Sequence, residues 1–379
     1  MRGSIRQRAE TFTCYWSATD AGTGKRLQYS KGGFKTKGAA QKHLNAILPK
    51  VDDGSWRPDR ALTVKQLLIE HWLPAQKARN LRATTLASYE GTAEWYLIPA
   101  LGAKKVAALT PADISALVEN MRTAKSARGR KGLSPRTAQA AVVTLKSATS
   151  WALRNGMLSR DPLTGVTPPR RERRPMKAWD TDEARAFLAY VHGDRLEAAW
   201  ALLLTRGLRR GELAGLRWNA VNLSEGTLQV THTRVSVDGR ATESIPKTEA
   251  GRRVIPLDAQ LVALLHARET QQKIERLRAG EAWADSGYVL INELGEPYHP
   301  EYLSDRFEVL VAASGLRRIR LHDLRHTACS LMLAAGVPVK VVQEMAGHSS
   351  PAITLALYTH TTPSMGREAG AALSASLLG

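Results

Sequence analysis

The C-terminal half of this 379-residue chain contains six side chains whose types suit an attack on a phosphodiester. In chain order they are Arg209, Lys247, His322, Arg325, His348 and Tyr358. A phosphodiester under attack becomes five-coordinate, and negative charge builds up on its nonbridging oxygens. Guanidinium groups match that geometry with two parallel donors and stay charged at any useful pH. The set therefore predicts cleavage and rejoining of a phosphodiester without a metal ion, and we expect no cofactor.

Five of the six side chains divide into phosphate binders and a nucleophile with its base. We expect Arg209 and Arg325 to hold the phosphate from two sides, with His348 as a third donor. Preorganised donors of this kind often supply the largest contribution to catalysis. Tyr358 has an unperturbed pKa of about 10, so it needs a positive field and a base to become a nucleophile. His322 is the candidate base.

Lys247 is the candidate general acid. It lies in a Pro-Lys-Thr sequence between two strand-like segments, at residues 241–245 and 252–255. A 5′-oxygen that leaves a phosphodiester needs a proton, and a lysine ammonium can supply it.

Two other interpretations of these residues are weaker. His322 and His326 are four residues apart, which on a helix is the spacing of zinc ligands. Asp323, however, stands where a zinc peptidase needs a longer Glu, and no third ligand follows at a recognisable spacing. Residues 22–25, Gly-Thr-Gly-Lys, suggest a phosphate-binding loop, but the first glycine of that pattern is missing and Arg26 replaces its Ser or Thr. They are more typical of a hairpin turn.

The order of these motifs resembles that of the tyrosine recombinase (phage-type integrase) family. The matching motifs are Gly-Leu-Arg-Arg-Gly-Glu-Leu at 207–213, Lys247 between strands, His-Asp-Leu-Arg at 322–325, Gly-His-Ser at 347–349, and Tyr358. They cover the chain from about Trp179 to Tyr358, whereas the N-terminal half matches in architecture only.

The resemblance implies a role for each position. Tyr358 would form a 3′-phosphotyrosine and free a 5′-hydroxyl, which stores the bond energy so that no ATP is needed. The other five side chains would assemble the phosphate site, and Glu212 would be a buried acidic residue that supports it. The sequence departs from the family at Ala346, where a Leu usually precedes the glycine; this changes a packing group only.

The positive charge of the chain is concentrated in its first half. The formal net charge is +19, and the printed sequence places this whole excess within the first 175 residues, because residues 176–379 carry equal numbers of basic and acidic side chains. A strongly basic segment predicts a polyanionic partner. We therefore expect the first half to supply most of the attraction to DNA, with a steep dependence on salt.

The remaining composition favours the cytoplasm. The two cysteines, Cys14 and Cys329, form no disulfide framework, which suits a reducing compartment. The first residues lack the apolar core of a signal peptide. No apolar run reaches 18 residues; the run at 198–205 is too short to span a bilayer. We expect a protein of the bacterial cytoplasm, associated with the nucleoid and not with a membrane.

Residues 1–57 are predicted to form a small module of strands followed by a helix. The expected elements are a strand at 11–19, a turn at 20–25, a strand at 27–34 and a helix at 37–48. The layout resembles the arm-type DNA-binding domain of phage integrases. Its sheet would contact DNA through Arg6, Arg8, Lys25, Arg26, Lys31 and Lys35. A generic basic β module or an oligomerisation element remains the alternative.

Residues 61–165 are predicted to be entirely helical, with helices at 64–76, 84–98, 111–124 and 135–155. Thr110 and Ser134 precede prolines and suit helix caps. The segment resembles the core-binding domain of the family. A basic loop between the last two helices would contact phosphate through Lys125, Arg128, Arg130 and Lys131, unless it is merely solvated. Residues 166–177 contain prolines and like charges and predict an extended linker.

Residues 178–379 are predicted to form the catalytic domain. We expect one antiparallel sheet of strands at 227–237, 241–245 and 252–255, with a hairpin turn at Asp238-Gly239. Helices are expected at 181–191, 196–208, 258–278, 300–313, 323–335 and 339–345. Tyr358 is expected in or near a short helix, and the Ala- and Leu-rich segment 363–378 is expected to pack on its own or a neighbouring protomer.

These elements define an α+β, multidomain fold: a sheet-plus-helix module, an all-α domain and a mainly α catalytic domain. The predicted function is site-specific recombination that integrates or excises a phage or mobile element. The predicted partners are double-stranded DNA attachment sites, three further copies of the chain in a tetramer, and an accessory DNA-bending protein or excision factor. Two alternatives stay open, a type IB topoisomerase-like relaxing enzyme and a non-enzymatic architectural protein.

Overall fold

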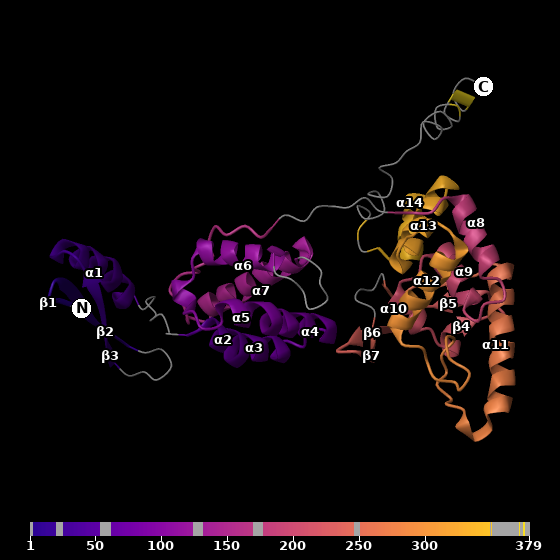
Figure 1. The fold of residues 1–379 in the computed structure, drawn as a ribbon, viewed down its shortest axis with the longest axis horizontal. Coiled ribbons are helices and arrows are strands. Elements are labelled where there is room, and N and C mark those ends of the chain that lie inside the picture. The colour runs from indigo at the N-terminus through magenta and orange to yellow at the C-terminus, as the bar shows by residue number, and fades with distance from the viewer. Residues whose placement is uncertain are drawn as a thin grey trace. The chain divides into compact units, whose positions relative to one another are not determined.

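The structure, a computed structural model, describes residues 3–19, 26–53, 62–123, 132–169, 177–245 and 251–348, together with residues 350, 371, 374 and 375. The chain divides into two compact units, Met1–Arg173 and Arg174–Gly379. Figure 1 shows the elements of each unit. Several predicted features lie outside the described residues: Lys25 and the turn at 20–25, the loop with Lys125, Arg128, Arg130 and Lys131, Lys247, Tyr358, and nearly all of the segment 363–378.

The described residues of the segment 3–53 form a three-stranded antiparallel sheet with one helix against it. The elements are β1 (Ser4–Arg8), β2 (Thr11–Thr19), β3 (Arg26–Phe34) and α1 (Lys37–Asp52), with strand order β1-β2-β3. Alternate residues of β2 face the helix, so Cys14 and Trp16 pack on Leu44 in a small core. Thr36 caps α1, because its Oγ1 accepts a hydrogen bond of 3.1 Å from the Ala39 N–H. The predicted strand-then-helix layout is confirmed.

The described residues between 62 and 154 are mainly helical, as predicted, around a second core. The helices are α2 (Val64–Gln66), η1 (Leu67–Trp72), α3 (Leu73–Ala78), α4 (Ala83–Thr92), η2 (Ala93–Leu97), α5 (Ile98–Leu101), η3 (Val106–Ala108), α6 (Pro111–Thr123) and α7 (Pro135–Arg154). The predicted cap of α7 is confirmed: Ser134 Oγ accepts from the Thr137 N–H at 3.2 Å. Thr110 Oγ1 likewise accepts from the Asp113 N–H at 3.3 Å.

Two of the predicted helices are widened by π-helical turns. The turn η1 comes directly before α3, which contains Pro74, and η2 comes directly before α5, which contains Pro99. A proline inside a helix lacks an N–H donor and its ring clashes with the carbonyl four residues earlier. A wider turn at that point relieves the clash while the helix continues.

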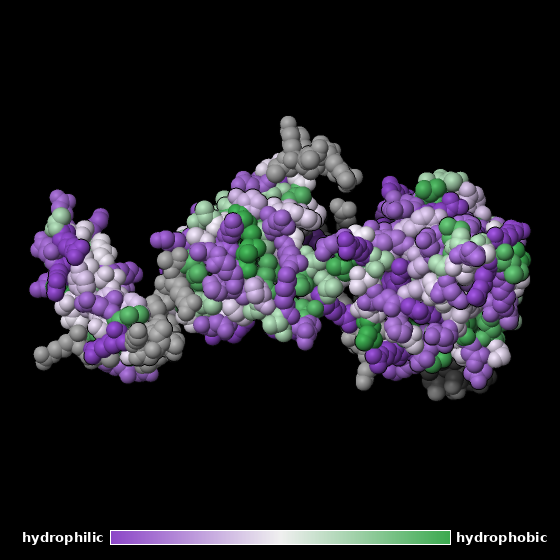
Figure 2. All heavy atoms as spheres, turned by 90° about the horizontal axis from the view of Figure 1, so that it is seen from below, coloured by the Kyte–Doolittle hydropathy of each residue, from purple (hydrophilic) through white to green (hydrophobic). Residues whose placement is uncertain are grey.

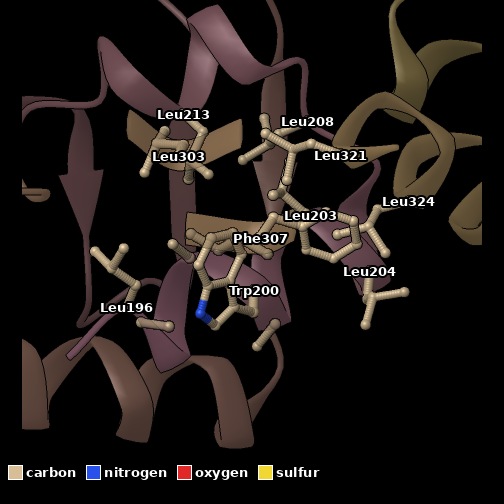
Figure 3. Packing of buried hydrophobic residues seen from close by; sticks show 14 of the residues in the cluster. Leu196, Trp200, Leu203, Leu204, Leu208, Leu213, Leu303, Phe307, Leu321 and Leu324 are labelled. Carbon is tan, nitrogen blue, oxygen red and sulfur yellow. The ribbon is translucent and has the colours of Figure 1, made fainter. Parts of the chain in front are cut away.

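The second unit is built around helix α9 (Glu197–Arg206). Every residue from Ala198 to Leu204 is buried, and Figure 3 shows Trp200 next to Phe307 within this cluster of leucines. The surrounding helices are α8 (Thr181–Tyr190), α11 (Ala259–Ala279), α12 (Pro300–Ser314), α13 (Leu321–Ala334) and α14 (Val339–Ala346). The apolar run of α9 is thus the core of a folded domain. Within the described part of the chain, no helix is long and apolar enough to cross a membrane.

The prediction of a single sheet in this unit is wrong, because the described strands form two sheets. One contains β4 (Val221–Asn222), β5 (Thr227–Gln229) and β8 (Val254–Pro256), and the other contains β6 (Thr233–Val237) and β7 (Arg240–Ser244). The predicted strand 227–237 is therefore broken after Gln229. The predicted hairpin turn is confirmed, because Asp238 and Gly239 have φ of 49° and 75°, as a type I′ turn requires.

The break has a physical cause in the short helix α10 (Arg210–Ala214). The chain leaves the first sheet and passes directly against this helix. A Cβ added to Gly215 would lie 2.9 Å from Thr233 Cα, and one added to Gly211 would lie 2.9 Å from Arg234 O. Gly211, within the 207–213 motif, and Gly215, just after it, therefore permit the close approach of residues 233–234 to α10. This approach places β6 beside the residues of the site.

The visible surface of both units is mainly hydrophilic (Figure 2). Figure 2 shows hydrophilic residues over much of both units, with hydrophobic residues as separate patches. Several large apolar side chains of the helical segment, including Ile69, Trp95 and Val143, are exposed. Single exposed apolar residues are normal in water-exposed proteins.

Candidate active site

Arg209 lies where α9 ends and α10 begins. Helix α9 ends at Gly207, which has φ of 62°, a conformation that favours glycine. The chain then turns, and Arg209 becomes the N-terminal cap of α10. Its backbone N–H donates to Glu212 Oε2 at 2.9 Å, and its Nη1 donates to Glu212 Oε1 at 2.5 Å. The Arg209 side chain is still 39% exposed, so it is open to a ligand.

Glu212 is the buried acid of the site. Its side chain is only 1% exposed, and it forms ion pairs with Arg209 and with Arg253. Burial alone would raise its pKa, but the hydrogen bonds and charge of Arg253 and the charge of Arg209 outweigh this and hold the pKa of Glu212 below its ordinary value. The carboxylate is therefore ionised and orients both guanidinium groups.

Arg325 approaches the same place from helix α13. It is buried, and its Nη1 donates to the Gly207 carbonyl at 2.8 Å. Burial and the neighbouring Arg209 charge lower the pKa of Arg325 to about 10. The group therefore stays charged at neutral pH.

His348 follows the C-terminus of helix α14. The helix ends at Ala346, and Gly347 takes φ of 66° to turn the chain. Arg209 Nη2 donates to the Gly347 carbonyl at 2.5 Å, which ties this turn to α10. His348 is buried, and its burial, followed by the charges of Arg325 and Arg209, lowers its pKa to about 4. At neutral pH the imidazole is therefore uncharged and can donate one neutral hydrogen bond.

His322 lies in the first turn of α13, which begins two residues earlier than predicted. The earlier start follows from a cap in which the Arg320 N–H donates to Asp323 Oδ2 at 2.9 Å. Desolvation by the surrounding protein, followed by nearby His326 and Arg325, lowers the pKa of His322 to about 4. A neutral imidazole, as a general base requires, is thus present at neutral pH.

The weaker interpretation of His322 and His326 as zinc ligands concerns two residues whose rings lie side by side. The rings of His322 and His326 are in edge contact, with centroids 5.0 Å apart. In the described ranges, no three His, Cys, Asp or Glu side chains gather in a way that could hold a metal ion. His326 Nδ1 is buried, and no described residue forms a hydrogen bond with it.

The gathered groups carry an excess of positive charge. Arg325 interacts electrostatically with Arg209 and Arg253 as well as with Glu212. Three guanidinium groups therefore surround one carboxylate. In a partly buried site such an excess attracts an anion strongly, because the interaction is less screened than in water. A phosphodiester, with more negative charge in its transition state than in its ground state, matches this site.

Sequence reasoning missed Arg253, although a signal for it exists. Arg253 and Ile255 are two residues apart around β8, so they share a face, while Val254 points the other way. Ile255 is fully buried and Val254 is 60% exposed. The alternation therefore places Arg253 on the buried side, where a guanidinium needs an acidic partner.

The structure divides the predicted DNA-contact residues of the first module. Arg6 pairs with Thr13, Arg8 with Thr11 and Arg26 with Thr19, so these three arginines share the face of the sheet that α1 does not cover. Lys31 pairs with Cys14, whose side chain faces α1, so the register places it on the opposite face. Lys35 follows the end of β3 and is exposed.

Together, the basic first unit and the cluster of arginines and neutral histidines suit the binding of a phosphodiester. Three family models match the chain: the phage integrase family over residues 177–365, an arm DNA-binding domain over 4–51, and the phage integrase N-terminal SAM-like domain over 65–121. The chain therefore belongs to the phage integrase family, the tyrosine recombinases, which cleave and rejoin DNA.

Individual relatives agree with this assignment. A tyrosine recombinase XerC-like protein of Caldanaerobacter subterraneus is 29% identical over 62% of this chain and 64% of its own length. An integrase of Streptomyces ambofaciens is 29% identical over 89% of this chain and 86% of its own length. The structure of the Tn1549 transposon integrase in complex with transposon right end DNA superposes with a TM-score of 0.66 at 21% identity, covering 84% of this chain and all of that one. That last likeness concerns the fold.

Proposed function

We propose that this protein is a site-specific recombinase that cleaves double-stranded DNA at attachment sites through a 3′-phosphotyrosine at Tyr358 and rejoins it to a second site. The observation that carries the proposal is the joining of Arg209, Glu212, Arg325 and His348 in one positively charged site, in a chain of this family. The reaction would integrate or excise a phage or another mobile element.

The phosphate step follows from the described geometry. Arg209 is exposed enough to meet a phosphate while Glu212 and the Gly347 carbonyl hold its guanidinium. Arg325 and His348 add donors from α13 and from the end of α14. Because these donors are fixed before the substrate binds, they stabilise the five-coordinate transition state without reorganisation.

The proton transfers are assigned to three residues. Neutral His322 removes the proton of the Tyr358 hydroxyl, which attacks the phosphorus. The bond to the 5′-oxygen breaks, and the Lys247 ammonium gives that oxygen its proton. The reverse sequence, with a 5′-hydroxyl from the second duplex, rejoins the strand. Atoms and charges balance, and no outside energy source is needed.

We also propose the predicted division of labour along the chain: an arm-type domain at 1–57, a core-binding domain at 61–165, a linker at 166–177 and a catalytic domain at 178–379. Strand exchange between two duplexes requires four active sites, so the active form is a tetramer on DNA. The structure of lambda integrase, a tetramer bound to a Holliday junction, supports this assembly. An accessory bending protein or excision factor would assist, and the protein would act in the cytoplasm.

The decisive experiment uses Tyr358→Phe, which removes only the hydroxyl group. On a nicked duplex that traps the covalent intermediate, wild type should form a protein–DNA adduct in excess chelator. Tyr358→Phe should bind the same duplex and form none. An adduct with Tyr358→Phe would contradict the assignment of the nucleophile.

The same assay separates the alternatives. Failure of wild type to form any adduct would favour an architectural DNA-binding protein. Adduct formation and plasmid relaxation without strand exchange between two marked duplexes would favour a topoisomerase-like enzyme.

A further inference from the structure

Arg253 has an unusual position among the arginines around the site. It directly precedes strand β8, and its side chain is 8% exposed. Its Nη1 and Nη2 donate to the two oxygens of Glu212 at 3.1 and 3.0 Å. Its Nε donates to the Met345 carbonyl at 2.7 Å. All three nitrogens thus have protein acceptors.

These bonds link three segments that are far apart in sequence. Glu212 belongs to α10, Arg253 to the start of β8, and Met345 to the last turn of α14. Arg209 makes a parallel set of bonds to Glu212 and to the Gly347 carbonyl. Two guanidinium groups therefore clamp the turn that precedes His348, and both depend on the same carboxylate.

We propose that Arg253 is a positioning residue for the phosphate site, which sets the orientation of Arg209 and of the turn that carries His348. This inference rests on the proposed function, since it assigns a role within the same site. Arg253 itself does not bind the DNA phosphate, because all three of its guanidinium nitrogens already donate to protein acceptors. Arg209, whose side chain is 39% exposed, is open to the ligand.

Arg253 can position Arg209 because both guanidinium groups donate to the same carboxylate, that of Glu212. Without Arg253, Glu212 would keep Arg209 as its ionic partner but lose two donors, and its carboxylate could rotate. The end of α14 would lose the bond to Met345 at the same time. A displacement of catalytic donors by about 1 Å can reduce a rate about 10²-fold.

The chain contains a matched control. Arg195 also forks onto a buried carboxylate, because its Nη1 and Nη2 donate to Glu275 at 2.7 and 2.6 Å. Its Nε also donates to a backbone carbonyl, that of Ile291, at 3.1 Å. The two arginines make the same kinds of bonds in the same unit, but Arg195 holds α11 and not the site. Loss of a buried ion pair as such should affect both variants.

The test compares the full-length variants Arg253→Met and Arg195→Met on the nicked duplex. Both should melt at lower temperature than wild type, so rates are measured below the lower melting temperature. Arg253→Met should form the adduct about 10²-fold more slowly, and Arg195→Met at nearly the wild-type rate. Arg253→Lys, which keeps the charge but loses the fork, should lie between wild type and Arg253→Met. Equal rates for Arg253→Met and Arg195→Met would overturn the positioning role.

A second measurement needs no cleavage. Each phosphate of the site duplex is replaced in turn by a neutral methylphosphonate, and binding is measured with Tyr358→Phe as the parent. The parent should lose most affinity at one phosphate. With Arg253→Met, substitution at that phosphate should no longer lower the affinity more than elsewhere, whereas with Arg195→Met it should. The same selective loss of affinity in both variants would overturn the proposal. If wild type forms no adduct but the preference still depends on Arg253, the proposed function fails and the positioning role stands.

Discussion

The two units of this protein use positive charge in opposite ways. The first carries nearly the whole net excess of the chain, largely on exposed side chains such as Arg6, Arg8 and Arg26. The second is almost neutral, yet it buries Arg253 and Arg325. Exposed charges attract a polyanion over a distance and are screened by salt. The buried charges are held by protein acceptors and belong to one site, where Arg325 faces the phosphate and Arg253 positions its neighbours.

Exposed and buried arginines also differ in the desolvation free energy that folding must offset. An exposed arginine needs no partner, whereas a buried guanidinium requires an acid or carbonyl to offset its desolvation. Glu212 supplies that partner for Arg209 and Arg253, and the Gly207 carbonyl accepts from Arg325. Affinity for DNA and chemistry on DNA are thus separable, and the predictions below test that separation.

The largest expected effect is on chemistry alone. Arg209→Ala should slow adduct formation by about 10²–10³-fold, because removing one preorganised donor has that effect elsewhere. Binding of the duplex should change little. Lys247→Ala should also be slow, but a bridging 5′-sulfur should restore its rate, because a thiolate leaves without a proton.

Arg209→Ala should not be restored by the 5′-sulfur, because its task is the charge on the nonbridging oxygens. The measurement is the rate of adduct formation of both variants on the ordinary duplex and on the duplex with a bridging 5′-sulfur. Equal defects of Lys247→Ala on the two duplexes would reassign the lysine to binding. A large loss of DNA affinity in Arg209→Ala would show that the catalytic site also contributes much of the binding free energy.

The next effect is on stability. His348 has its pKa lowered from 6.5 to about 4 in the folded protein, so between those values the unfolded chain binds the extra proton. The resulting stability is fully present above pH 6.5 and is lost as the pH falls towards 4. It amounts to at most about 3 kcal/mol.

Urea unfolding of wild type and His348→Asn at several pH values from 7.5 to 4.5 measures this contribution. The difference between the two unfolding free energies should shrink as the pH falls. Parallel curves would show that His348 is not held in its neutral form by burial and by the neighbouring arginines.

Local chemistry made much of this structure predictable. The Asp238-Gly239 turn and the cap at Ser134 depend only on neighbouring residues. The motif at 207–213 placed Arg209 and Glu212 together, because they are three residues apart at the start of one helix. The meeting of Arg325 and His348 with them followed from the family resemblance, since no local rule connects those segments.

Contacts between distant segments could not be predicted in this way. Arg253 lies 41 residues from Glu212 and 92 from Met345, and no periodicity relates these positions. The strand break after Gln229 has the same origin, because it depends on the close approach of residues 232–234 to α10. The register that separates Lys31 from the arginines of the first sheet includes a bulge between Phe12 and Cys14, which composition does not reveal.

The smallest expected effect concerns a single exposed charge of the first unit. Arg26 pairs with Thr19 on the uncovered face of the sheet, whereas Lys31 pairs with Cys14 on the face of α1. If the uncovered face binds DNA, Arg26→Ala should weaken binding a few-fold and lower the slope of log affinity against log salt by about 1. Lys31→Ala should change both much less, although it removes the same formal charge. Salt titrations of full-length protein on a long attachment fragment measure both slopes. Equal slopes for the two variants would mean that the first unit attracts DNA by its net charge and not through one face of its sheet.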